Sequence, residues 1–122
     1  MIGFAVASAA AAAGVAIHGF VGSRRVVQPL LKAPHLPPAS RWLMFLCWHA
    51  VTILLVALTA GFGWAASDPA ANPVGGFLAA LTGSLAALTL YVCRRAGFPP
   101  WRVPPLVLFT LMTAAAAWSI LT

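Results

Sequence analysis

Four long stretches without Asp, Glu, Lys or Arg restrict the fold of this sequence more than any other feature. They are Ile2–Ser23, Trp42–Ala66, Val74–Cys93 and Val103–Leu121. A helix needs roughly 20 mostly apolar residues to cross a bilayer, and each stretch is about that long. Because 62% of the 122 residues are hydrophobic and 7% are charged, the chain has too little polar surface for a water-soluble globule. The sequence therefore predicts an all-α membrane protein.

The segments between these stretches have the composition of loops. They read QPLLKAPHLPPAS, SDPAANPVGG and RRAGFPPWRVPP, and they are rich in residues that end or redirect helices. Asn72 is expected to cap the third helix, with Pro73 at the first helical position. We expect one transmembrane domain over residues 1–122, with helices at about 2–23, 42–66, 74–93 and 103–121.

The first stretch could alternatively be a cleaved signal peptide, because it holds a run of alanines. A signal peptide carries basic residues before its apolar part. Here no basic residue precedes the apolar part, which is also too long, and Arg24 and Arg25 follow it. We therefore interpret it as a retained helix.

The basic residues predict the orientation of the helices. All seven fall in or beside the first and third loops, whereas the second loop carries the only acid, Asp68. They are Arg24, Arg25, Lys32, Arg41, Arg94, Arg95 and Arg102. Because cytoplasmic loops are enriched in Lys and Arg, we expect this side to be cytoplasmic, with both termini on the periplasmic side of a bacterial inner membrane.

The same residues are expected to interact with anionic lipid headgroups of the bilayer. A net charge of +6 could also indicate nucleic-acid binding. The chain has none of the folded readers or stacking platforms that such binding needs, so we expect no nucleic-acid partner.

Each helix carries one stripe of small and polar residues at helical spacing. The stripes are Ala7, Ala11, Gly14, His18 and Gly22; His49, Thr52, Val56, Thr59 and Gly63; Gly75, Ala79, Thr82, Ala86, Thr89 and Cys93; and Leu106, Thr110, Thr113 and Ala117. Helices in lipid associate through close packing of small residues and through hydrogen bonds. The stripes therefore predict the inward faces of an antiparallel four-transmembrane-helix bundle.

Two of the stripe residues are histidines at a similar depth. His18 lies six residues before Arg24, and His49 lies eight residues after Arg41. On antiparallel helices that rise 1.5 Å per residue, both rings are expected roughly 10 Å inside the basic interface. An ionisable side chain within a bilayer is costly unless it is paired, so the pair is a candidate functional site.

The pair has two main interpretations. Each ring could bond a backbone carbonyl, a hydroxyl such as that of Thr52, or the other ring, and so tie the helices together. Alternatively, His18 and His49 could be axial ligands of a haem or related pigment. Gly14 and Gly22, one turn before and after His18, would then leave room for the flat ring.

A third interpretation is a transition-metal site that also uses Cys47 or Cys93. Such sites need three or four ligands, and the sequence has no paired motif, so we expect no metal. It also has no Ser/His/Asp set, carboxylate pair or glycine-rich phosphate loop, so we expect no enzyme activity.

The segments HGFVGSRRVVQPLL and CWHAVT resemble an uncharacterised family of small bacterial integral membrane proteins. The matching positions are His18, Gly22, Pro29 to Leu31, Trp48, His49 and Thr52. The resemblance covers the first two helices and the basic loop. It implies the four-helix architecture and the choice of histidines, and it implies no substrate.

Almost no mass lies outside the four predicted helices, and this bounds the function. Loops of about 20 residues or fewer are shorter than the roughly 50 residues of the smallest ordinary domains. We expect a non-catalytic accessory or interaction subunit, partnered by a membrane protein or by further copies of itself. The alternatives are an electron carrier that binds haem or pigment through His18 and His49, and a small oligomeric transporter or channel. The sequence identifies no cofactor.

Overall fold

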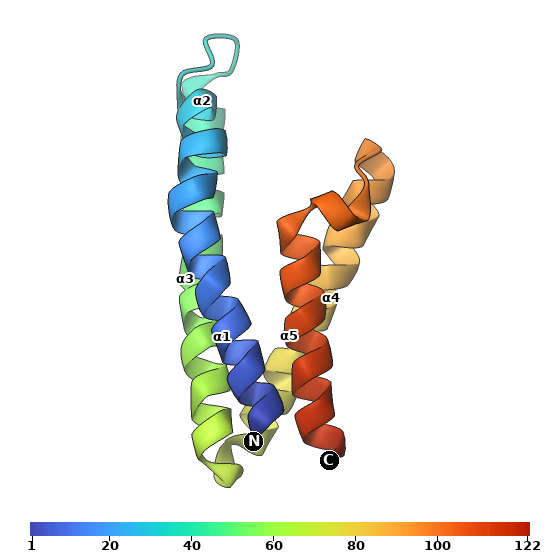
Figure 1. The fold of residues 1–122 in the computed structure, drawn as a ribbon. Helices are drawn as coiled ribbons and strands as arrows, with labels where there is room; N and C mark the ends of the chain where they lie inside the picture. Colours follow the sequence, from blue (N-terminus) through green and yellow to red (C-terminus); the bar gives the residue numbers. More distant parts are fainter.

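The chain folds entirely into helices. The computed structural model describes residues 1–122 and contains no strand (Figure 1). Four helical segments are long and apolar enough to cross a membrane: Ile2–Leu31, Pro38–Ser67, Pro69–Ala96 and Pro104–Leu121. The prediction of four such helices is confirmed, although their ends differ from those predicted.

Some of these segments combine several types of helix. They consist of α1 (Ile2–Ala16), the π-helix η1 (Ile17–Val27), α2 (Gln28–Leu31), α3 (Pro38–Ser67), the 3₁₀ turn η2 (Pro69–Ala71), α4 (Asn72–Ala96), the 3₁₀ turn η3 (Pro100–Arg102) and α5 (Pro104–Leu121).

The first two helices extend further than predicted. The first continues to Leu31 and the second begins at Pro38, so that only residues 32–37 connect them. Their prolines suggested a longer loop, but Pro29 lies within the continuous helical segment Ile2–Leu31. Pro38 lies in the first turn of α3, where a missing N–H costs little. Nη1 of Arg41 donates a hydrogen bond to the carbonyl of Leu31 at 3.0 Å and closes the short loop.

The start of α4 also differs from the prediction. Asn72 is the first residue of the helix and its side chain makes no capping hydrogen bond. Because η2 precedes α4, the capping role passes to Asp68, whose Oδ1 accepts a hydrogen bond from the amide of Ala70 at 2.9 Å. The helix ends before Gly97, whose φ of 73° is in the left-handed region that favours glycine.

The helices pack as two pairs, and α1 also packs closely on α5, where the amide of Phe4 donates to Oγ of Ser119 at 3.1 Å. In the first pair, the hydroxyl of Ser8 on α1 donates to the carbonyl of Thr59 on α3 at 2.8 Å. In the second pair, the hydroxyl of Thr113 on α5 donates to that of Thr82 on α4 at 2.9 Å. Figure 1 shows the two pairs meeting near the chain termini and diverging toward the opposite end.

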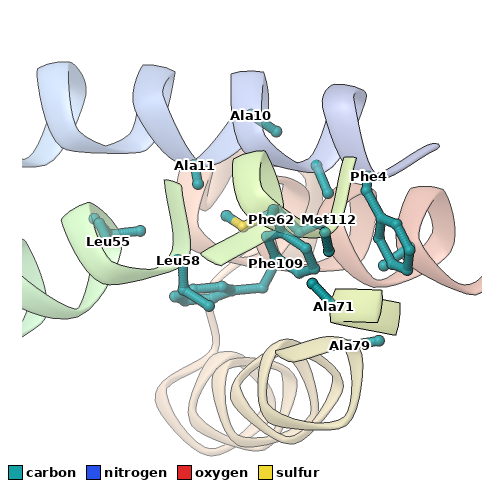
Figure 2. Close-up of a cluster of buried hydrophobic side chains, with 13 residues drawn as sticks. Phe4, Ala10, Ala11, Leu55, Leu58, Phe62, Ala71, Ala79, Phe109 and Met112 are labelled. Atoms are coloured by element: carbon teal, nitrogen blue, oxygen red, sulfur yellow. The ribbon is translucent and has the colours of Figure 1, made fainter. Parts of the chain in front are cut away.

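A cluster of buried apolar side chains joins the two pairs near the termini (Figure 2). It includes Phe4 from α1, Leu58 and Phe62 from α3, Ala79 from α4 and Met112 from α5. Large and small side chains interlock there at the close packing of a protein interior. The helix pairs are therefore held together mainly at one end.

The predicted inward faces are correct for α1 and α4 and displaced by one residue on α3 and α5, although Thr113 of the predicted α5 stripe does contact α4. The buried residues of α1 and α4 include Ala7, Ala11, Gly14, Gly75, Ala79, Thr82 and Cys93. Those of α3 and α5 are Leu55, Leu58, Phe62, Ala65, Phe109, Met112 and Ala116. Val56 and Thr110, which were expected to face inward, are exposed.

A stripe of small residues forms a groove on the helix surface, and large side chains of the facing helix must fill that groove. The stripes of α1 and α4 form such grooves, and Leu, Phe and Met side chains, mostly of α3 and α5, fill them. A threonine of α3 also satisfies its hydroxyl within its own helix. Thr59 donates to the Leu55 carbonyl at 2.8 Å, so a threonine need not face another helix.

Candidate functional site: a cleft between the helix pairs

An apolar cleft of about 930 Å³ lies between the two helix pairs. One wall comes from α1, η1, α2 and α3, and the other from α4 and α5. The lining includes Ile17, Val21, Val26, Met44, Trp48, Val51, Leu85, Thr89, Pro105 and Leu108. The cleft occupies the part of the molecule where Figure 1 shows the pairs diverging. Its volume is within the roughly 300–1,000 Å³ of small-molecule sites.

His18 lies in the wall of this cleft and contacts α3. Its Nε2 is 2.9 Å from the backbone carbonyl of Trp48, and its ring stacks on the Trp48 indole, with centroids 4.0 Å apart and an interplanar angle of 11°. Because a carbonyl only accepts hydrogen bonds, Nε2 carries the proton in this bond. His18 thus makes the bond between helices that the first interpretation described.

Gly22 allows the Trp48 indole to approach η1. A Cβ built at Gly22 would lie 2.5 Å from Cζ2 of Trp48. At Gly14 a Cβ would lie 3.2 Å from a methyl carbon of Leu55 and 3.6 Å from one of Leu108. Protein side chains therefore fill the space at both glycines, which the haem interpretation expected to be open for a flat ring.

His49 lies at the predicted level but on a different side of α3. Its ring meets that of Phe45 edge-on, with centroids 4.4 Å apart, and it does not line the cleft. No hydrogen bond joins it to His18, which bonds to the preceding residue, Trp48, instead. One residue along a helix of 3.6 residues per turn is a rotation of about 100°. The two histidines therefore lie at a similar level along the helices, but their side chains have different partners.

The two cysteines differ in their exposure. Cys47 is exposed in the cleft wall, and Cys93 is buried on α4. No group of three or more His, Cys, Asp or Glu side chains lies close enough to hold a metal ion. The transition-metal interpretation therefore has no ligand set.

Arg25 is the one permanently charged residue among the 20 that line the cleft. It lies on η1 and is exposed, while the neighbouring Arg24 is outside the cleft lining. Arg25 was not expected in a cleft, because the first helix was predicted to end at Ser23. The spacing of His18, Gly22 and Arg25 continues the first stripe and could have indicated it.

The other basic residues gather at the same end of the molecule as the cleft. They are Arg24, Lys32, Arg41, Arg94, Arg95 and Arg102, at or near the ends of α2, α3, α4 and η3. The only acidic residue, Asp68, lies between α3 and η2. This end of α3 is close to the N-terminus, whose amine donates a hydrogen bond to the carbonyl of Ala66 at 3.4 Å. The chain therefore has a basic open end and an opposite end that holds the core.

No protein-family model matches this chain, and no curated protein or solved structure is significantly similar to it.

Proposed function

We propose that this chain is a multi-pass protein of a bacterial inner membrane, an antiparallel four-helix bundle with its basic end in the cytoplasm. Four apolar helices of spanning length support this proposal. Large apolar side chains such as Ile53, Phe77 and Trp118 are 71%, 68% and 67% exposed, as expected for surfaces that face acyl chains. The gathering of basic residues at one end supports the orientation.

Within that membrane, we propose that the chain is a non-catalytic accessory subunit that holds one membrane-embedded partner between its helix pairs. The observation that carries this proposal is the apolar cleft of about 930 Å³. Apolar walls lose van der Waals contacts unless apolar groups pack against them. A partner that fills the cleft contacts both walls at once, so the arrangement favours binding.

Native mass spectrometry of protein released from its own membranes tests this function. Val26 and Met44 line the cleft and are each 46% exposed, so tryptophan at both positions can fill space without entering the core. The matched control is Leu43→Trp with Val92→Trp, two exposed positions outside the cleft lining.

We expect the wild type and the control to retain one additional bound species. The Val26→Trp, Met44→Trp variant should lose that species. A wild type without a bound species, or one that both variants retain equally, would contradict the proposed function. Unchanged gel-filtration profiles verify that the variants are folded.

A further inference from the structure

We propose that the partner held in the cleft is an anionic lipid, with its phosphate-bearing headgroup at Arg25 and its acyl chains against the apolar walls. This inference rests on the proposed function, which leaves the chemistry of the partner open. It follows from the charge, the shape and the size of the cleft.

The charge of the cleft indicates the headgroup. Arg25 is exposed on η1, and its guanidinium has no carboxylate partner, because the only acid, Asp68, follows α3 at the end close to the N-terminus. An Arg side chain presents five N–H donors in a planar fork that matches phosphate oxygens. A phosphate therefore supplies the missing counter-charge.

The distribution of polar groups indicates the tail. The lining residues nearest to Arg25 along η1 and α2 are Val21, Gly22, Val26 and Leu30, and none of them has a polar side chain. The remaining wall is dominated by Leu, Val, Pro and aromatic residues. One fixed charge on an otherwise apolar surface matches an amphiphile with one anionic head. At a basic cytoplasmic interface, anionic lipids are the amphiphiles at hand.

The size and the shape of the cleft suit a lipid. Its volume of about 930 Å³ is in the range of small-molecule sites. Acyl chains are thin and flexible and can follow a cleft whose walls diverge (Figure 1).

The test compares two probe lipids with identical acyl chains, phosphatidylglycerol and phosphatidylcholine, titrated onto delipidated protein in detergent and detected by native mass spectrometry. The variant is Arg25→Gln. The matched control is Arg24→Gln, which removes the same charge one residue away from a side chain outside the cleft lining.

We expect the wild type to bind phosphatidylglycerol about tenfold more tightly than phosphatidylcholine, the effect of one charge-assisted contact. Arg25→Gln should abolish this preference and weaken phosphatidylcholine binding much less, because the choline cation already balances the phosphate of that headgroup. Arg24→Gln should keep the preference. Free inorganic phosphate should not compete, because it lacks the tail that the cleft holds.

Several results would overturn the inference. Equal affinity of the wild type for the two lipids, or equal losses in Arg24→Gln and Arg25→Gln, would show general attraction to the basic end. Competition by inorganic phosphate would show an ion site without a tail. An adduct of polypeptide mass that the Val26→Trp, Met44→Trp variant loses would contradict the lipid but support the proposed function. Lipid binding that survives in that variant would contradict both.

Discussion

At the scale of single residues, Trp48 connects η1 to α3 in three ways. Its carbonyl accepts a hydrogen bond from His18, its indole stacks on the imidazole, and the same indole covers Gly22. The stack and the close approach depend on each other, because a bulkier residue at position 22 would push the indole away. His18, Gly22 and Trp48 therefore act as one packing unit in the cleft wall.

The first prediction concerns the two glycines of η1. Gly22→Ala should lower stability by about 1–3 kcal/mol, the usual cost of overpacking, because the new Cβ would lie 2.5 Å from Trp48. Gly19→Ala is the matched control, since no atom lies within 4 Å of a Cβ there. Thermal unfolding in mild detergent measures both, and equal melting temperatures would contradict the contact.

The second prediction concerns the histidines. His18→Ala should cost on the order of 1 kcal/mol by removing a hydrogen bond between helices, whereas His49→Ala should cost less. The double variant should show the sum of the two losses, because the rings make no hydrogen bond with each other. A double loss clearly smaller than the sum, measured by the same unfolding assay, would indicate direct coupling of the two rings.

The level of His18 could be predicted from the sequence, but its partner could not. Counting residues from Arg24 and Arg41 places His18 opposite residues 48 and 49, as observed. The choice between those residues depends on rotation about the helix axis. The fit of a bulky ring against a glycine predicts the contact better, because Trp48 packs against Gly22.

At the scale of elements, the four helices use two different solutions to packing. The grooves of α1 and α4 follow small residues, as the sequence predicted, while α3 and α5 contribute Leu, Phe and Met. A stripe of threonines on a helix does not identify its buried face, because a threonine hydroxyl can donate to the carbonyl four residues earlier. The face of α3 was mispredicted by one residue for that reason.

The third prediction separates the two kinds of threonine. Thr82 is fully buried and accepts a hydrogen bond from the Thr113 hydroxyl on the neighbouring helix, whereas Thr110 is exposed. Thr82→Val should lower the stability by about 1 kcal/mol, and Thr110→Val should leave it nearly unchanged. Comparable losses for the two variants in chemical denaturation would show that the face of α4 or of α5 is assigned wrongly.

At the scale of the whole molecule, unequal helix lengths contribute to its open shape. The 30 residues of α3 and the 18 of α5 correspond to about 45 Å and about 27 Å at 1.5 Å per residue. The large buried side chains gather near the termini, and the pairs diverge beyond them (Figure 1). Composition predicted the number of helices but could not predict this divergence, which depends on which large side chains meet.

The fourth prediction is the orientation in the membrane. A reporter that fluoresces only in the cytoplasm should stay dark when it is fused after Thr122. The same reporter should be bright when it is inserted between Lys32 and Pro34, within the short basic loop. A bright fusion at Thr122 would reverse the orientation, and with it the leaflet from which the proposed lipid comes.

The most direct test of the account asks whether the helix pairs are joined at one end and separated at the other. Disulfides form only between residues whose Cα atoms lie within about 7 Å, so brief oxidation in native membranes reports the separation of α3 and α4. At the closed end, a Cβ at Gly61 would lie 3.7 Å from Cγ of Leu78. At the open end, Cys47 and Thr89 both line the cleft.

We predict that Gly61→Cys with Leu78→Cys crosslinks when Cys47 and Cys93 are replaced by serine. The native Cys47 with Thr89→Cys should not crosslink on a Cys93→Ser background. Efficient crosslinking of the second pair would show that the cleft is closed, which would contradict the account.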